Sequence, residues 1–285
     1  MFLTHVLLAS CPDAPGISAA VTGFIAQSNG FILDSQQHGD NATGQFFLRI
    51  AFKSATDETL DVDSLTSRFA AVAKQFAMRF GIFDAKTRPQ MLIAVSRFGH
   101  CLNDLLHRWR TGSLPVEIVG VVSNHDDMRA LVEWHGLPYH HLPIKADTKA
   151  AQEQAFRHII EASGAELVVL ARYMQILSAE FSTFLAGRCI NIHHSFLPSF
   201  KGAKPYHQAY ERGVKLIGAT AHYVTDDLDE GPIIEQDVER VDHGWSASQL
   251  VEAGQDIEAR VLARAVRWHV ERRVLRKGNK TVVFR

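Results

Sequence analysis

From Met91 onward, the chain alternates short, almost wholly apolar runs with segments that have the spacing of amphipathic helices. The apolar runs are MLIAVS, VEIVGVVS, LVVLA, CINIHH and IGATAHYV, and a further short strand is expected at PYHHLPI. Strands that are apolar on both faces are typical of a mostly parallel sheet covered by helices on both sides. The pattern therefore predicts a doubly wound α/β domain, in which ligands bind beyond the carboxyl ends of the strands. The segments SRFGHC, ARYMQIL and NIHHS each follow such a strand.

Residues 1–85 have a different order of elements. A predicted strand at Thr4–Ala9 is followed by a helix from about Gly16 to Asn29-Gly30 and by two strands, Phe31–Gln37 and Gln45–Phe52. A second helix, Val62–Phe80, and a short last strand, Gly81–Asp84, complete the order. This order is that of a ferredoxin-like α+β unit, with helices on one face of a small antiparallel sheet. Asp13 is expected to cap the first helix. We place the boundary near Lys86, which divides the chain into domains 1–85 and 86–285.

Near the end of the chain, a long helix is predicted from Ser246 to Arg276. Its charged residues are expected to form a solvated face; they include Glu258, Arg260, Arg264, Arg267 and Arg272.

Composition excludes several classes of function. Thirty basic and thirty-one acidic residues give a net charge of −1, so neither a nucleic-acid partner nor an anionic membrane is expected, and a small ligand is favoured. Cys11, Cys101 and Cys189 lie far apart, which argues against a disulfide framework and a zinc cluster. The apolar first residues lack a basic region and are too short for a membrane span, so we expect a cytoplasmic protein.

The segment from Cys189 to Ile234 carries the polar groups best suited to catalysis. Asn191 and His193 are two residues apart on a predicted strand, so their side chains project from the same face. With Asp229 they would supply a hydrogen-bond donor, a proton carrier and a carboxylate. Two other interpretations stay open: ordinary polar residues at a strand end, or a metal site built from the segment's histidines. Those histidines, His193, His194, His207 and His222, match no HExxH or Cys/His ligand spacing.

The segments NIHHSFLPSFKGA and HYVTDDLDEGPII resemble the family of formyltransferases that use 10-formyltetrahydrofolate. The resemblance implies that Asn191, His193 and Asp229 are catalytic, and that His222, seven residues before Asp229, binds substrate. It implies a doubly wound fold, no metal, and no cofactor beyond the folate substrate itself. The segment LARYMQIL is similar to the family's folate-contacting loop. By that likeness the pteridine pocket is lined by Arg172, Met174, Ile176 and Leu177, although a plain core role stays open for Met174 and Ile176.

The amino-terminal segment CPDAPGISAAVTGFIAQSNGFILDSQQHGD resembles an ACT domain, a ferredoxin-like module that often senses amino acids. An ACT domain ahead of the formyltransferase-like domain makes the whole chain similar to the formyltetrahydrofolate deformylases. That resemblance implies water as the acceptor, tetrahydrofolate and formate as products, and a role in one-carbon balance and in formate supply for purine synthesis. It also implies a homo-oligomer and an amino-acid effector such as methionine or glycine. The residues that would bind this effector are Asp13, Gly16, Asn29 and Gly30.

Two alternatives differ in the acceptor or in the class of function. A formyltransferase to a small amine such as glycinamide ribonucleotide would use a Gly-Ser-Asn-rich loop after the first strand, where backbone N–H groups cradle a phosphate. This chain has Arg97, Phe98 and His100 there, which should obstruct such a phosphate. A catalytically idle folate or amino-acid sensor would have no evident need for Asn191, His193 and Asp229 together.

Overall fold

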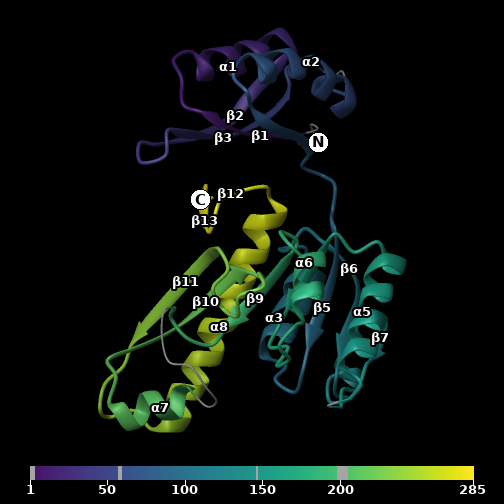
Figure 1. Cartoon of the computed structure of the whole chain (residues 1–285), viewed down its shortest axis with the longest axis vertical. Coiled ribbons are helices and arrows are strands. Elements are labelled where there is room, and N and C mark those ends of the chain that lie inside the picture. Colours follow the sequence, from purple (N-terminus) through teal and green to yellow (C-terminus); the bar gives the residue numbers. More distant parts are fainter. Residues whose placement is uncertain (1–3, 57–59, 146, 198–204) are drawn as a thin grey trace. The chain divides into compact units, whose positions relative to one another are not determined.

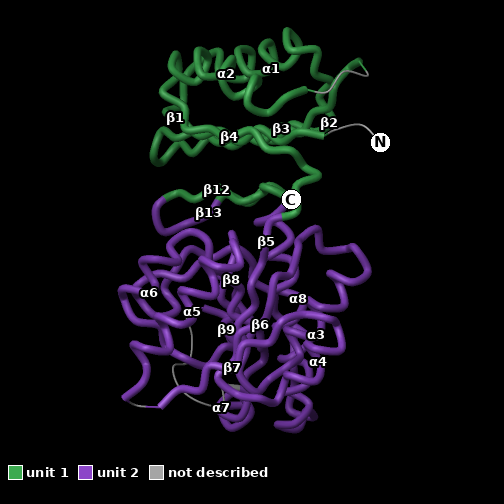
Figure 2. The backbone as a smooth tube through the Cα atoms, turned by 90° about the vertical axis from the view of Figure 1, so that its right-hand side faces the viewer, with its two compact units in different colours: residues 1–88, 271–277, 282–285 green, residues 89–270, 278–281 purple. Residues whose placement is uncertain are grey.

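The computed structural model describes residues 4–56, 60–145, 147–197 and 205–285. The chain forms two compact units (Figure 2). The first comprises Met1–Arg88, Glu271–Lys277 and Val282–Arg285, and the second comprises Pro89–Val270 and Gly278–Thr281. The final residues of the chain therefore group with the first unit, which the sequence analysis did not anticipate.

The first unit is an antiparallel sheet with two helices on one face, as Figures 1 and 2 show. Among the described residues, its four strands are ordered β2-β3-β1-β4. The elements are β1 (Thr4–Pro12), α1 (Ile17–Gln27), β2 (Gly30–Asp40), β3 (Gln45–Ser54), α2 (Val62–Gln75) and β4 (Arg79–Asp84). Phe69 is fully buried between the helices and the sheet, and its ring contacts Phe24 and Phe80 edge-on. The predicted ferredoxin-like arrangement is confirmed.

Two local predictions in this unit were wrong. Helix α2 ends at Gln75 rather than at Phe80, because Ala77 takes a left-handed conformation with φ 51° and the Met78 N–H returns to the Ala73 carbonyl. This is a Schellman-type stop, which is usually made by glycine, so no residue type at this position indicated it. Asp13 also does not cap α1, whose N-cap is Gly16 with φ 91° and no side-chain hydrogen bond.

The second unit contains a mixed sheet whose strands are ordered β11-β10-β9-β8-β5-β6-β7 among the described residues. Strands β5 to β9 are mutually parallel, whereas β10 runs antiparallel to both β9 and β11. The mostly parallel α/β fold is therefore confirmed. Its first elements are β5 (Gln90–Val95), α3 (His100–Arg110), β6 (Glu117–Ser123), α4 (Arg129–Trp134), β7 (Tyr139–His141) and α5 (Lys149–Ser163). Then follow β8 (Leu167–Leu170), α6 (Ala179–Phe184), β9 (Cys189–His193), α7 (Pro205–Arg212), β10 (Leu216–Tyr223), β11 (Ile233–Arg240) and α8 (Ala247–Val270).

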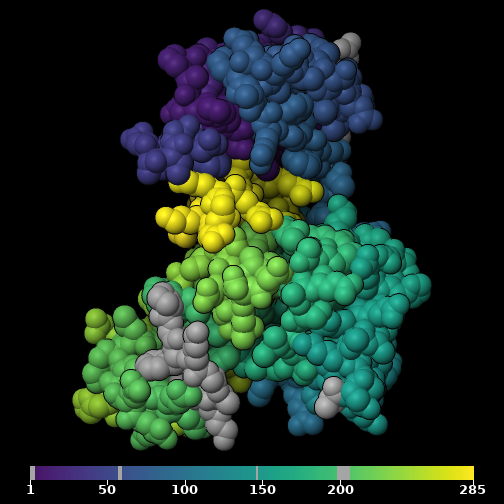
Figure 3. Space-filling model, viewed as in Figure 1, coloured from purple at the N-terminus to yellow at the C-terminus, as the bar shows by residue number. Residues whose placement is uncertain are grey.

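Strand order in the second unit fixes where the loops meet. From β5 the chain adds β6 and β7 on one side, and then returns to place β8 and β9 on the other. In the space-filling view, the surface of this unit is shared between teal segments that precede β9 and green segments that follow it (Figure 3). The direction of strand addition reverses between β5 and β8, so the loops after these two strands flank a topological switch point.

The end of the chain departs from the predicted long helix. Helix α8 stops at Val270, and β12 (Val274–Lys277) and β13 (Lys280–Val283) form a hairpin where the helix was expected to continue. Arg272, with φ 55°, interrupts the helical backbone.

The predicted solvated face of α8 is only partly correct. Arg264 and Arg267 are exposed, but Glu258 has only 1% of its surface exposed. The reason is that α8 packs against α3 and α7 as well as along β9, β10 and β11, so more than one of its faces is covered. None of the helices in the described ranges is long and apolar enough to cross a membrane.

Candidate active site

Strand β9 delivers Asn191 and His193 to the wall of a cavity. The two side chains are partly buried and line the cavity, while Ile190 beside them is buried and is not among the described lining residues. Alternation along the strand explains this division, because residues two apart share a face. Cys189 lies earlier on the same strand, fully buried in the apolar core, where burial raises the pKa of its thiol far above the ordinary value. It is a packing residue.

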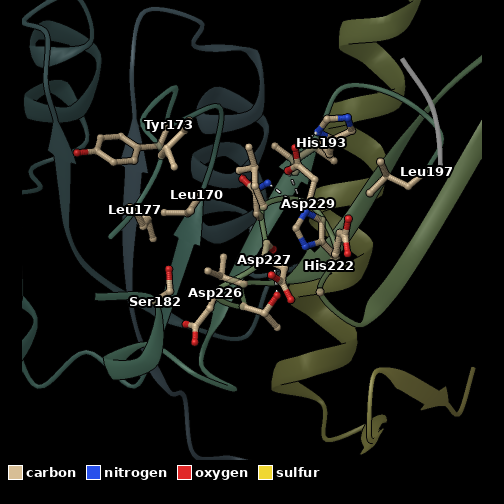
Figure 4. Close-up of a pocket in the computed structure, with 18 of the residues that line it drawn as sticks. Leu170, Tyr173, Leu177, Ser182, His193, Leu197, His222, Asp226, Asp227 and Asp229 are labelled. Atoms are coloured by element: carbon tan, nitrogen blue, oxygen red, sulfur yellow. Dashed lines mark hydrogen bonds and ion pairs between the residues drawn. The ribbon is translucent and has the colours of Figure 1, made fainter. Parts of the chain in front are cut away.

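The cavity has a volume of about 790 Å³, enough for a ligand the size of a folate head group. Figure 4 shows His193, His222 and Asp229 on one side of it and Leu170, Tyr173 and Leu177 on the other. The lining comes from the loop after β8, from β9 and its following residues, from β10, and from the loop between β10 and β11. Its described members are Leu170, Arg172, Tyr173, Met174, Gln175, Ile176, Leu177, Ser182, Asn191, Ile192, His193, His194, Leu197, His222, Val224, Thr225, Asp226, Asp227, Leu228, Asp229, Glu230, Gly231, Ile233 and Asn279.

Asp229 bridges two imidazoles. One carboxylate oxygen lies 3.2 Å from Nδ1 of His193, and the other lies 3.6 Å from Nε2 of His222. Since Nδ1 of His193 faces Asp229, its Nε2 is the nitrogen available to a ligand. Asn191 lies beside the pair, with its amide nitrogen 3.2 Å from His222 Nε2.

The environment of Asp229 decides its charge. Burial by itself would raise the pKa of this carboxyl, but hydrogen bonds and charge from His193 and His222 outweigh burial and hold the pKa well below its usual range. Asp229 is therefore a carboxylate at neutral pH, and a weak base. It can accept a hydrogen bond from the Nδ1–H of His193.

The backbone around Asp229 is held in an unusual shape. Asp229 itself has φ 59°, and a Cβ on Gly231 would come within 1.7 Å of the Tyr223 carbonyl oxygen, so only glycine fits there. The pairing of β10 with β11 shifts register between Ala221 and His222, because Ile234 of β11 is an extra residue without a partner on β10. Strained backbone of this kind persists only where the surrounding structure enforces it, and it is concentrated at functional sites.

His222 contacts both Asn191 and Asp229. Its Nδ1 lies 2.9 Å from the Tyr223 carbonyl, which can only accept a hydrogen bond, so Nδ1 carries a proton. Nε2 of His222 lies 3.2 Å from the Asn191 amide nitrogen and 3.6 Å from Asp229: it accepts one N–H of Asn191 when His222 is neutral, and it directs its own N–H toward Asp229 when His222 is protonated. The second N–H of that amide remains to donate to a ligand.

All four residues predicted for the folate pocket line the cavity. Met174 and Ile176 are 50% and 62% exposed, so they are not core residues. Arg172 is different, being 9% exposed with φ 64°. Its backbone carbonyl accepts a hydrogen bond from the Ser96 N–H at 3.2 Å, which ties this loop to the loop after β5.

The residues that follow His193 hold the end of β9 in place. The His194 ring stacks on that of His193 with centroids 4.8 Å apart. Thr220, fully buried on β10, donates to the Ser195 carbonyl at 3.0 Å and accepts from the Leu197 N–H at 3.1 Å. His207 lies on α7, and Lys204 lies outside the described residues.

Several cavity residues were missed from the sequence. Among them are Ser182, Asn279 and the acidic loop members Asp226, Asp227 and Glu230. The acidic run DDLDE was a usable signal for the loop, because a cluster of acceptors suits a ligand with several N–H groups. Nothing local pointed to Asn279, which is far along the chain.

The four residues predicted to bind an effector do not meet within one chain. Asp13 and Gly16 precede α1, whereas Asn29 and Gly30 follow it. The helix has 11 residues, so about 16 Å separate its ends. Asn29 has φ 55°, and a Cβ on Gly30 would lie 2.6 Å from the Ile25 side chain, so turn and packing requirements account for these two residue types.

Within the described ranges, one group of three side chains has metal-ligand geometry: His100, Cys101 and Glu258. Arg172 already opposes the Glu258 charge, with its Nε 3.3 Å from the carboxylate. Burial raises the pKa of the Cys101 thiol well above its ordinary value, with the Glu258 charge adding to the rise, so the thiol stays protonated. The trio is a poor cation site for these reasons.

Comparison with known proteins identifies relatives over the whole chain. A family model described as formyl transferase matches residues 90–266. A formyltetrahydrofolate deformylase from Corynebacterium sp. (strain P-1) is 54% identical over 282 residues, which cover 99% of this chain and 98% of the relative. The crystal structure of a formyltetrahydrofolate deformylase from Burkholderia mallei ATCC 23344 has a TM-score of 0.94 at 55% identity, covering 99% and 100% of the two chains.

A second group of similar structures covers less of the chain. Glycinamide ribonucleotide transformylase 1 from Symbiobacterium toebii is 30% identical with a TM-score of 0.66, and the match covers 70% of this chain and 95% of that one. The likeness to deformylases therefore spans both units, while the likeness to this transformylase leaves a large part of the chain unmatched.

We predict that His194 makes the stability of the fold sensitive to mild acid. Burial, together with the charges of Arg172 and His193, lowers the pKa of His194 to about 4. The unfolded chain binds a proton at this position near pH 6.5, so the stabilisation is complete above that pH and is lost as the pH falls toward 4. In urea unfolding between pH 6.5 and 4.5, the unfolding free energy of the parent should fall more steeply than that of His194→Gln, by up to about 1.4 kcal/mol per pH unit.

The control is His107→Gln, because His107 is exposed on α3. It should keep the parent's pH dependence. Parallel curves for the parent and His194→Gln would show that His194 is not buried in its neutral form.

Proposed function

The chain belongs to the formyltetrahydrofolate deformylases, within the formyl transferase family, and from this membership we propose that it hydrolyses 10-formyltetrahydrofolate to tetrahydrofolate and formate. The observation that carries the proposal is the contact of Asp229 with His193, beside Asn191, in the wall of a cavity large enough for the folate head group. Such a reaction would balance the one-carbon pool and supply formate for purine synthesis.

The oxyanion is the first requirement of this reaction. Water attacks the formyl carbon, a C–O bond forms, and negative charge develops on the former carbonyl oxygen. We assign the free N–H of Asn191 and Nε2–H of protonated His193 as its donors. One such donor is typically worth about a hundredfold to a thousandfold in rate.

The proton balance follows from the low pKa of Asp229. A carboxylate held this acidic is a poor proton acceptor, so we assign it to orient the attacking water and to stabilise protonated His193. Water loses a proton as the tetrahedral intermediate forms, and N10 gains one as its bond to the formyl carbon breaks. His193 carries this transfer: its Nε2 gives a proton to N10 and regains one from the attacking water oxygen, while Asp229 holds the ring through Nδ1. The products are the secondary amine of tetrahydrofolate and formate.

The rest of the cavity suits a pteridine ring. Leu170, Leu177 and Leu228 offer apolar surface for its faces. The loop from Thr225 to Gly231 offers carboxylates and carbonyls for the N–H groups at its edge, and it is anchored where the Thr183 hydroxyl donates to Asp226 at 3.2 Å. We assign Arg172, Met174, Ile176, Leu177 and His222 as substrate-binding residues.

The runner-up is formyl transfer to a small amine, and it is supported by the likeness to the transformylase. It requires an acceptor site beside the formyl carbon. The loop after β5 would have to form it, but His100 of that segment is engaged with Glu258 at 2.7 Å. Hydrolysis needs no such site.

We further propose a regulatory role for the first unit, by its likeness to ACT domains. An amino acid such as methionine or glycine would bind near Asp13 and Gly16, and Asn29 and Gly30 of a second subunit could complete the site in a homo-oligomer.

The three cysteines are free and buried, which suits a reducing compartment such as the cytosol.

The proposed reaction predicts that the purified chain, given 10-formyltetrahydrofolate and no acceptor, releases formate in equal amount to tetrahydrofolate. A coupled formate assay and the absorbance of the folate measure the two products. Release of formate only after an amine is added would favour the transferase instead, and no turnover under either condition would favour an idle sensor.

Asp229→Asn should reduce kcat by about a hundredfold to a thousandfold while retaining folate binding, because an amide cannot stabilise protonated His193. Asp227→Asn is the matched control, since it changes the same charge in the same loop without contact to His193; it should affect KM more than kcat. A variant Asp229→Asn with the parent's kcat and pH profile would contradict the assigned role.

The regulatory proposal predicts a saturable change in the rate of formate release when methionine or glycine is titrated into the full chain. Asp13→Ala should abolish the response, and Asp63→Ala, on α2 of the same unit, should retain it. An unchanged rate together with no heat of binding would remove the proposal, and a monomer mass in light scattering would remove its oligomeric form.

A further inference from the structure

The switch point between β5 and β8 is closed in this protein. In open α/β sheets, the crevice beyond the carboxyl ends of the strands at such a point is where ligands bind. Here Ser96 joins the two loops that flank it. Its N–H donates to the Arg172 carbonyl at 3.2 Å, and its hydroxyl accepts from the Met174 N–H at 3.0 Å and donates to Asn124 at 2.7 Å.

A buried charged group lies next to these loops, and we call it the Glu258 cluster: His100, Arg172, Tyr206 and Glu258. One Glu258 oxygen lies 2.7 Å from His100 Nε2 and 3.3 Å from Arg172 Nε, and the other accepts the Tyr206 hydroxyl at 2.7 Å. The exposed fractions of the Glu258, Arg172 and His100 side chains are only 1%, 10% and 17%. Four separate elements, the loop after β8 and helices α3, α7 and α8, therefore converge on one carboxylate.

The packing around the cluster is shaped to admit it. Gly254 lies one helical turn before Glu258 on α8, and a Cβ at Gly254 would come within 2.1 Å of the Tyr206 ring. The absence of that side chain lets the phenol lie on the helix and reach Glu258. On the other side, the ring of Phe98, half exposed, lies 5.4 Å from the Arg172 guanidinium.

Buried charged residues such as these generally stabilise a fold no more than apolar residues of the same size. Burial would raise the pKa of Glu258, but the hydrogen bond from His100 and the charge of Arg172 outweigh it and lower the pKa, so Glu258 is a carboxylate. Removing paired charges from water costs several kcal/mol, and apolar residues of similar volume often stabilise a core as well or better. This comparison favours a functional reason for the cluster.

The cluster adjoins the catalytic histidines. Arg172 lines the cavity, whereas the other three members are not among its described lining residues, so Arg172 forms the boundary between the cavity and the cluster. The His194 ring stacks on that of His193, and the charges of both Arg172 and Glu258 act on it. The filled region is therefore next to the position assigned to the formyl carbon.

We propose that the Glu258 cluster fills the space through which a second substrate would reach the formyl carbon, and thereby restricts the acceptor to water. This inference rests on the proposed hydrolysis. His100 of the cluster, and Phe98 beside it, determine acceptor specificity by occupying this space. Glu258 is a positioning residue that holds His100 and Arg172 in place.

The chemistry that the cluster excludes is transfer to a small primary amine. The lone pair of the amine would attack the formyl carbon, the bond from that carbon to N10 would break, and N10 would gain a proton while the amine loses one. The products would be a formamide and tetrahydrofolate, with no formate. Water and an amine therefore compete for the same carbon, and the ratio of formamide to formate reports which of them reaches it.

The test uses the full chain with 10-formyltetrahydrofolate and glycinamide as the probe amine. His100→Ala removes the imidazole but leaves Arg172 and Tyr206 on Glu258. Phe98→Ala opens the region from its half-exposed side, with little risk to the core. In either variant the ratio of N-formylglycinamide to formate, measured by mass spectrometry, should rise about tenfold or more over the parent, in proportion to glycinamide. The matched control is His107→Ala, on the exposed face of α3, which should keep the parent ratio.

The product ratio does not depend on how much of a variant is folded, so partial loss of stability does not obscure the result. If both variants release formate and neither yields more formamide than the parent, the proposal is wrong. Failure of the parent to release formate would instead contradict the proposed hydrolysis.

Discussion

The contact of Asp229 with two imidazoles is the interaction on which the candidate site depends. It requires β10 to pair with β9 so that His222 lies opposite Asn191. It also requires a positive φ at Asp229, and a glycine at Gly231, where the backbone lies close to the Tyr223 carbonyl oxygen. The β9–β10 pairing and the conformation of Asp229 together place its carboxylate against both imidazoles. The result is a carboxylate whose charge is fixed by its neighbours before any substrate arrives.

Glu258 and Asp229 show how one chemical group can receive two roles. Both are carboxylates whose pKa is lowered by partners despite burial. Asp229 is paired with histidines, faces the cavity and can meet a ligand. Glu258 is enclosed by Arg172, His100 and Tyr206, and its charge interacts with these residues rather than with a ligand. The first arrangement suits chemistry, and the second suits a rigid wall.

The failures of sequence reasoning have a common cause. The strands from β1 to β10 were located because their apolar runs are local signals, whereas the more polar β11, β12 and β13 were not. The end of α2 was missed because a non-glycine residue, Ala77, makes the turn, and the end of α8 was missed because Arg272 does the same. Glu258 was placed in solvent because helical spacing shows which residues share a face, but not how many faces are covered. Asn279 joined the cavity through a hairpin that the pattern did not indicate.

The sequence by itself determined the order of most strands and helices as far as β10, the fold class of both units, and the shared face of Asn191 and His193. These follow from periodicities of two and of about four residues, which depend only on neighbours along the chain. Tertiary structure alone decided the charge of Asp229 and the burial of Glu258. The reason is physical distance along the chain: His100 and Glu258 are separated by 158 residues, and the field at a carboxylate depends on what surrounds it in space.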